Sequence, residues 1–150
     1  MVKALETYIV TNGNGRQAID FYKNVFQADL VNMMTWEEMD PNCLEDRKDL
    51  IINAQLIFDG IRLQISDENP DFVYQAGKNV TAAIIVGSVE EAREIYEKLK
   101  KNAQEVQLEL QETFWSPAYA NLVDQFGVMW QISTELNNRF YHLSIAMIDL

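Results

Sequence analysis

The sequence predicts an α+β fold made of two βαβββ modules, because one succession of patterns occurs twice along its 150 residues. The apolar run at residues 7–13 ends on a glycine, and the run at residues 81–87 does the same. Each run is followed by apolar residues at helical spacing, and each half ends in a hairpin-like segment with a glutamine four residues after a glycine. The repeat therefore makes two pairs of positions equivalent: Thr7 with Thr81, and Gln64 with Gln131.

The first half contains one helix between strands. Asn12-Gly13-Asn14-Gly15 is typical of a sharp turn, and apolar residues at spacings of three and four follow it. Asp59-Gly60 suits a tight hairpin turn. Residues 37–49 contain Pro41 and show no period, which indicates a loop or a short irregular helix. The expected elements are strands at about 4–12, 29–36, 51–58 and 61–66, and a helix at about 16–27.

The second half repeats this order. Ser88 and Glu91 form a capping box, in which the hydroxyl accepts from the backbone and the carboxylate reaches back, so a helix should begin there and end near Lys101. Strands are expected at about 81–87, 105–111, 118–124 and 128–134. The chain is thus one domain over 1–150, with modules at about 1–70 and 78–134 and a C-terminal extension at 135–150.

Composition excludes several classes of protein. The net charge of −11, from 12 basic and 23 acidic residues, disfavours nucleic-acid binding. No apolar run approaches the roughly 20 residues that cross a bilayer, so no membrane partner is expected. An acidic Glu6 interrupts the N-terminal apolar stretch, which argues against a signal peptide. Cys43 is the single cysteine and forms no disulfide within the chain, so we expect a cytoplasmic protein.

Several motifs carry a resemblance to a known family. They are the segments at residues 8–22 and 54–60, Ser66-Asp67, Glu112-Thr-Phe-Trp115, and Asp124-Gln-Phe-Gly-Val-Met-Trp130. Together they resemble the PhnB-like branch of the glyoxalase/bleomycin-resistance/dioxygenase (vicinal oxygen chelate) superfamily over about residues 4–134. The resemblance implies two βαβββ modules that curl into an open, barrel-like mixed sheet, commonly in a homodimer.

The resemblance also implies a cleft that holds one divalent metal ion in the superfamily's enzymes, with ligands from the first and last strands of each module. In this chain those positions fall on Thr7, Gln64, Thr81 and Gln131. Metal-dependent members have His or Glu there, whereas neutral hydroxyls and amides compete poorly with water for a transition metal. We therefore expect no metal and no cofactor. Asn53 stands where related sequences often have His.

Strand alternation predicts which side chains face this cleft. Gln64 should bring Arg62 and Ser66, and Gln131 should bring Met129 and Ser133. By the same rule Thr7 should bring Ile9 and Thr11, and Thr81 should bring Ala83 and Ile85. Arg62 is expected to pair with an acid such as Glu112, or to orient an anionic ligand group. The candidate ligand-binding residues are Thr7, Asn53, Gln55, Arg62, Gln64, Thr81, Trp115, Tyr119, Met129 and Gln131.

Three functions remain open at this stage. The first is binding of a small organic molecule by a metal-free homodimer, with no catalytic residue, because no acid or base stands at the four positions. The second is a metal-dependent lyase, isomerase or dioxygenase with ligands from elsewhere. The third is sequestration of a cationic drug, as in bleomycin-resistance proteins. The Thr and Gln side chains could also simply bond with one another, and Trp115 and Tyr119 could serve packing or dimer contact.

Overall fold

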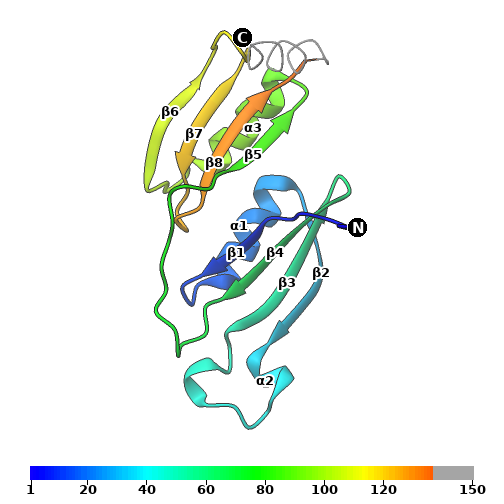
Figure 1. Ribbon diagram of the computed structural model, residues 1–150, viewed down its shortest axis with the longest axis vertical. Helices are drawn as coiled ribbons and strands as arrows, with labels where there is room; N and C mark the ends of the chain where they lie inside the picture. Colours follow the sequence, from blue (N-terminus) through cyan, green and yellow to red (C-terminus); the bar gives the residue numbers. More distant parts are fainter. Residues whose placement is uncertain (137–150) are drawn as a thin grey trace. The chain divides into compact units, whose positions relative to one another are not determined.

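The computed structural model describes residues 1–136 and shows an α+β chain whose described part divides into two compact units, residues 1–75 and residues 76–136 (Figure 1). Each unit contains a four-stranded mixed sheet and one long helix. No helix within residues 1–136 has the length and apolar character needed to span a membrane. Residues 137–150 of the expected C-terminal extension, which include the single histidine, His142, lie outside the described part of the chain.

The first unit has the strand order β1-β4-β3-β2, in which β1 runs parallel to β4 and the other neighbours are antiparallel. A short helix and a 3-10 turn occupy the segment expected to be irregular. The elements are β1 (Tyr8–Thr11), α1 (Gly15–Phe26), β2 (Asp29–Thr35), α2 (Trp36–Met39), η1 (Glu45–Arg47), β3 (Ile51–Phe58) and β4 (Ile61–Asp67).

The second unit repeats this topology with the order β5-β8-β7-β6, and β5 again runs parallel to the last strand. The βαβββ succession expected from the sequence is confirmed in both units, with strand ends shifted by a few residues at most. The elements are β5 (Ala82–Val86), α3 (Val89–Leu99), β6 (Glu105–Gln111), β7 (Tyr119–Val123) and β8 (Met129–Thr134).

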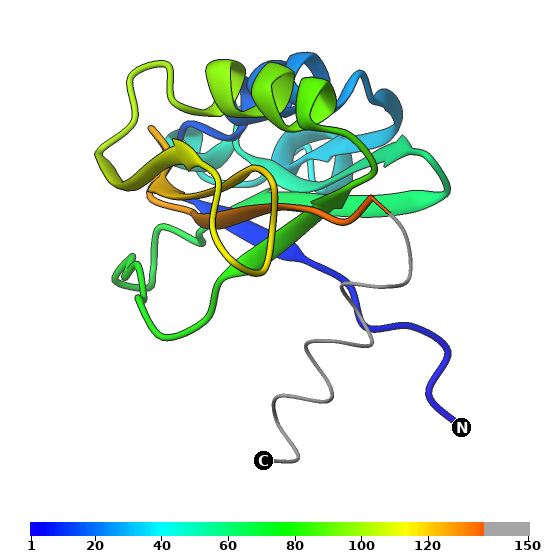
Figure 2. The same ribbon diagram turned by 90° about the horizontal axis from the view of Figure 1, so that it is seen from above.

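Each long helix covers one face of its own sheet (Figure 2). In the first unit, α1 buries Ala18, Ile19, Tyr22 and Val25 against the strands. In the second, α3 buries Ala92, Tyr96 and Leu99. These residues follow the spacing of three and four that predicted the helices, because that spacing places apolar side chains along one stripe of a helix.

The start of α3 confirms the capping box. The Glu91 backbone N–H donates to Ser88 Oγ at 3.2 Å, and the Glu91 carboxylate accepts from the Gly87 backbone N–H, also at 3.2 Å. The first bond satisfies a donor that a helix N-terminus leaves without a partner inside the helix, and the second fixes the residue just before the N-cap. The helix therefore begins where the sequence places it.

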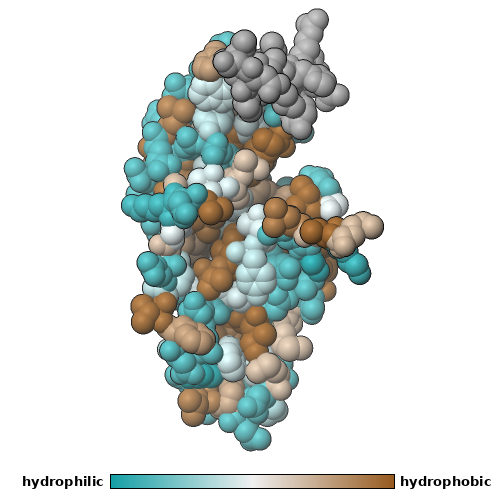
Figure 3. All heavy atoms as spheres, viewed as in Figure 1, coloured by the Kyte–Doolittle hydropathy of each residue, from teal (hydrophilic) through white to brown (hydrophobic). Residues whose placement is uncertain are grey.

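We call the face of each sheet that its own helix does not cover the helix-free face. On β4 and β8 the expected alternation is confirmed: Leu63, Ile65, Trp130 and Ile132 are buried on the helix side. Their neighbours Arg62, Gln64, Ser66, Met129, Gln131 and Ser133 lie on the helix-free faces and are less buried. Hydrophobic and hydrophilic side chains are mixed on the surface of the first unit seen in Figure 3.

Candidate functional site

The first strand of the first unit corrects one expectation from the sequence. Ile9 and Thr11, expected beside Gln64, are 4% and 1% exposed and lie on the helix side of the sheet. Tyr8 pairs with Gln64 in the parallel ladder, so Tyr8 shares the helix-free face with Gln64. Because successive side chains alternate, Thr7 belongs with Ile9 and not with Gln64. Strand alternation therefore places Thr7 on the face opposite Gln64, which differs from the expectation that the two share one face.

Strand pairing explains the error. Tyr8 lies beside Gln64, and Ala83 lies beside Gln131, whereas the sequence repeat aligns Tyr8 with Ala82. The turn between the first strand and the helix is one residue longer in the first unit than in the second. Aligning the two halves by their helices therefore misaligns their first strands by one residue. The structural equivalent of Thr81 is consequently Glu6. The expectation for Thr81 itself holds, since Ala83 and Ile85 are exposed on its face.

Gln64 is the centre of the polar cluster on the first sheet. Its amide nitrogen donates to Glu6 Oε2 at 3.2 Å, and its amide oxygen accepts from Asn53 Nδ2 at 3.1 Å. Asn53 Nδ2 also lies 3.3 Å from the hydroxyl of Tyr8, and Asn53 Oδ1 accepts from Gln55 Nε2 at 3.2 Å. The structure thus brings Asn53, Gln55 and Gln64 together as expected, and adds Glu6 and Tyr8.

Arg62 forms an ion pair with Glu6, not with Glu112. Its Nε donates to Glu6 Oε2 at 2.6 Å and its Nη2 donates to Glu6 Oε1 at 2.7 Å, which is a bidentate arrangement. The Arg62 hydrogen bonds lower the pKa of Glu6, and those same bonds raise the pKa of Arg62. Both groups are therefore charged near neutral pH and neutralise each other.

Gln131 is the centre of a similar cluster on the second sheet. Its amide nitrogen donates to Thr81 Oγ1 at 2.7 Å, and its amide oxygen accepts a short hydrogen bond from the hydroxyl of Tyr119. In both sheets, then, the glutamine of the last strand donates to a residue at the start of the first strand and accepts from the third. This fixes the direction of each amide.

Other polar and aromatic groups adjoin Gln131. Asn121 pairs with Gln131 across β7 and β8, and its Oδ1 is buried without a hydrogen-bond partner within residues 1–136. Trp115 packs edge-on against Tyr119, with ring centroids 5.2 Å apart, and against the exposed Phe114 at 4.8 Å. Half of the ten candidate residues belong to the second unit: Thr81, Trp115, Tyr119, Met129 and Gln131.

Two buried carboxylates support the strands that carry these clusters. Asp67 accepts from Thr11 Oγ1, the Gly15 backbone N–H and the Ile51 backbone N–H, each at 2.8 Å. Asp124 accepts from the Trp130 indole N–H at 2.8 Å and from two backbone N–H groups of the turn before β8. Their oxygens are engaged in the fold, and Trp130 is a core residue as expected.

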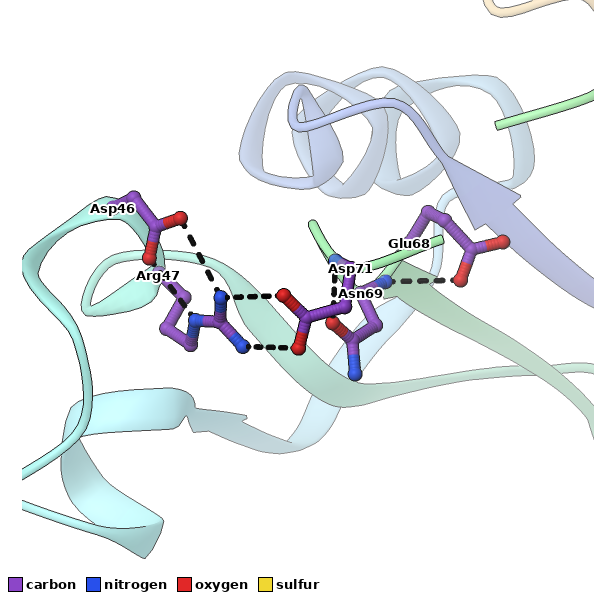
Figure 4. A network of polar contacts seen from close by, with 5 residues as sticks. All are labelled: Asp46, Arg47, Glu68, Asn69 and Asp71. Atoms are coloured by element: carbon purple, nitrogen blue, oxygen red, sulfur yellow. Dashed lines mark hydrogen bonds and ion pairs between the residues drawn. The ribbon is translucent and has the colours of Figure 1, made fainter. Parts of the chain in front are cut away.

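A network of ion pairs around Arg47 lies elsewhere in the first unit (Figure 4). Arg47 is 7% exposed, contacts Asp71 with two nitrogens at 3.0 and 3.1 Å, and contacts Asp46 at 3.0 Å. Its guanidinium also lies 5.5 Å from the ring centroid of Trp36. These bonds raise the pKa of Arg47, and Arg47 lowers the pKa of Asp71. The network fastens the α2–η1 segment to the chain after β4 and is structural.

The residues at the four expected metal-ligand positions, with Glu6 in place of Thr7, do not fit a divalent transition metal ion. Glu6 is a carboxylate, but both of its oxygens accept hydrogen bonds from Arg62. The amide oxygens of Gln64 and Gln131 already accept from Asn53 and Tyr119, and neutral amides are poor ligands for such ions. Within residues 1–136, no group of three or more His, Cys, Asp or Glu side chains is placed to hold a metal.

Sequence reasoning missed Glu6 and Tyr8 because it aligned the two halves by their glycines and helices. The signal that identifies them is the alternation within the strand itself. Ile9 is apolar and Thr11 precedes the turn, and treating these two as core residues would have placed Glu6 and Tyr8 on the other face. No pattern in the sequence links Glu6 to Arg62, because they are distant along the chain.

Comparison with known proteins gives consistent results. The model of the Glyoxalase/Bleomycin resistance protein/Dioxygenase superfamily matches residues 4–132. Protein YjdN of Escherichia coli (strain K12) is 26% identical over 144 residues, covering 86% of this chain and 93% of that protein. The crystal structure of PA1353 from Pseudomonas aeruginosa has a TM-score of 0.78 with 28% identity, over 88% of this chain and 98% of that one. A PhnB protein of Bacillus cereus, described as a putative 3-demethylubiquinone-9 3-methyltransferase, shares the fold, with a TM-score of 0.71 and 20% identity over 89% and 100%.

Proposed function

We propose that this chain, which belongs to the glyoxalase/bleomycin resistance protein/dioxygenase superfamily, binds a small organic molecule through the helix-free faces of its sheets and needs no catalytic metal ion. The observation that carries the proposal is the fixed direction of the two glutamine amides. Gln64 and Gln131 are each held by hydrogen bonds on both sides. A binding site uses a few oriented polar groups of this kind among apolar side chains.

The second sheet supplies the clearest set of ligand contacts. Asn121 Oδ1 is a buried acceptor without a partner within the described residues, and a ligand N–H or O–H would satisfy it. The Thr81 hydroxyl accepts from Gln131 and keeps its own proton for donation. Trp115 and Tyr119 offer aromatic surface beside these groups. Together they suit a ligand with both apolar and hydrogen-bonding parts.

The first sheet would add amide and hydroxyl groups. We include in the proposed ligand-binding residues Tyr8, Asn53, Gln55, Arg62, Gln64, Thr81, Trp115, Tyr119, Asn121, Met129 and Gln131. Thr7 is left out because it belongs to the other face of its strand.

Location and assembly are also part of the proposal. The single cysteine, Cys43, suits a reducing compartment such as the cytoplasm. A homodimer is expected from the family resemblance, and sedimentation velocity of the purified chain would detect it. A single species with the mass of one chain would contradict the dimer.

Two measurements test the binding proposal. The first is mass spectrometry of small molecules released from the purified protein, together with thermal unfolding against a library of neutral and charged metabolites. A ligand at about 100 times its Kd stabilises the folded state by about 2.7 kcal/mol, which shifts the unfolding temperature measurably. If no compound co-purifies and none in the library shifts the transition, the proposal is wrong.

The second measurement uses variants that remove one amide. Gln131→Leu keeps the side-chain size and loses the hydrogen bonds, so affinity for the identified compound should fall about 2- to 10-fold. Gln111→Leu is the matched control, because Gln111 is exposed and, among residues 1–136, the hydrogen bond of its side-chain amide is to the Glu109 carbonyl oxygen. Equal affinities of the two variants would remove Gln131 from the binding site.

A further inference from the structure

We propose that Glu6 is a built-in occupant of an anion-binding site, so that Arg62 does not bind anionic ligands and the first sheet accepts uncharged ones. The inference rests on the proposed small-molecule function, and it names the class of ligand. It also reverses the expectation from the sequence, in which Arg62 orients an anionic group.

The geometry is that of a carboxylate-binding site filled by the chain's own carboxylate. Two guanidinium N–H groups of Arg62 reach the two oxygens of Glu6 at 2.6 and 2.7 Å. A third donor, Gln64 Nε2, reaches Glu6 Oε2 at 3.2 Å. Paired guanidinium N–H groups are the usual protein device for binding carboxylates and phosphates. Any anionic ligand must take the place of Glu6 to use these donors.

The backbone holds Glu6 in this place. Tyr8 pairs with Gln64 in the sheet, and the Gln64 backbone N–H donates to the Thr7 carbonyl oxygen at 3.3 Å. Glu6 therefore directly precedes a paired segment and is tethered beside Arg62. A tethered group acts at an effective concentration of about millimolar or more, which a free ligand has to exceed.

The second sheet shows that the charge of Glu6 is not needed to orient the glutamine. There Thr81 occupies the position equivalent to Glu6 and accepts the Gln131 amide N–H with a neutral hydroxyl. Met129 occupies the position equivalent to Arg62. The sheet without the cation thus also lacks the anion. Because the second sheet lacks both the acid and the base, we infer that Glu6 serves to neutralise Arg62.

Chemical rescue with acetate tests the inference. Acetate has the carboxylate of Glu6 without the tether, and the Glu6→Ala variant removes the occupant while leaving Arg62 and Gln64 in place. Side-chain NMR signals of Arg62 Nε and Gln64 Nε2 report occupancy during a titration at constant ionic strength. We expect the midpoint for acetate to be about 10-fold lower in Glu6→Ala than in the wild type.

Two control variants are available in the chain. Arg62→Met, which copies Met129, should abolish the acetate response in the Glu6→Ala background. Glu45→Ala frees another cation in the same unit, Lys48, whose Nζ lies 2.6 Å from Glu45. It should leave the acetate midpoint of the Arg62 and Gln64 signals at its wild-type value, because Glu6 still occupies Arg62 in this variant.

Each outcome decides the inference. Equal midpoints in wild type and Glu6→Ala would overturn it, and so would a folded Glu6→Ala variant that does not bind acetate. Unfolding temperatures of the variants establish that they are folded. The titration uses acetate alone, so its failure leaves the binding role of Gln131 intact. A failed search for a ligand, in turn, leaves the result for Glu6 intact.

Discussion

Replacing Asp67 by alanine should destabilise the first unit by about 2–6 kcal/mol. Asp67 is 7% exposed and accepts from Thr11, Gly15 and Ile51. Thr11 keeps an alternative acceptor, because its hydroxyl also lies 3.1 Å from the Ser66 carbonyl oxygen. The two backbone N–H groups do not, and each buried donor left without a partner costs about 1–3 kcal/mol. A typical domain has only about 5–15 kcal/mol of stability, so the loss should be large.

The assay is urea unfolding followed by circular dichroism, combined with hydrogen exchange of the Ile51 amide. The Ile51 amide reports the first unit specifically, since Ile51 begins β3. Asp67→Asn keeps one acceptor oxygen, so it should lose about 1–3 kcal/mol, less than the alanine variant. Asp49→Ala is the control: Asp49 is exposed, and its replacement should change stability by about 0.5 kcal/mol at most. A loss below about 1 kcal/mol for Asp67→Ala would refute the reasoning.

Three further predictions follow from other parts of the structure. Leu122→Ala should lower the free energy of unfolding by about 2–5 kcal/mol, because Leu122 is 0% exposed. Leu44→Ala is the control and should lower it little, because Leu44 is 65% exposed. Similar losses for the two variants would contradict the described core. Arg47 lowers the pKa of Asp71 below its ordinary value of 3.8, so the carboxylate stabilises the fold above that value and ceases to do so as the pH falls through the lowered pKa. The stability difference between wild type and Asp71→Asn in urea unfolding should therefore shrink from about pH 6 to about pH 2, and a constant difference would refute this. Dialysis against a chelator should leave the unfolding temperature unchanged, and stoichiometric metal in elemental analysis would contradict the metal-free proposal.

The succession of strands and helices was predictable because it depends on local patterns. Apolar spacing fixed α1 and α3, the Ser88 capping box fixed a helix start, and glycine-containing turns separated the hairpin strands. The family expected from the quoted motifs is confirmed by the superfamily match over residues 4–132. These properties belong to single segments, so a sequence displays them directly.

The composition of the first polar cluster was predicted only in part, since it depends on register between distant strands. Gln64 and Asn53 come together as expected, but Thr7 was chosen where Glu6 belongs. A shift of one residue moves every side chain of a strand to its other face, and the longer turn before α1 makes that shift. The predicted ion-pair partner of Arg62, Glu112, was wrong for a related reason. Pairing between residues that are distant along the chain leaves no local pattern in the sequence.

The extra residue in the turn before α1 has a consequence for protein engineering. A designer who wished to install a metal site by analogy between the halves would substitute position 7, and the new ligand would then lie on the wrong side of the sheet. Position 6 is the productive choice, although its carboxylate must first be released from Arg62. Such a substitution should therefore be planned from the residues that pair between strands, and not from a residue-by-residue alignment of the duplicated halves.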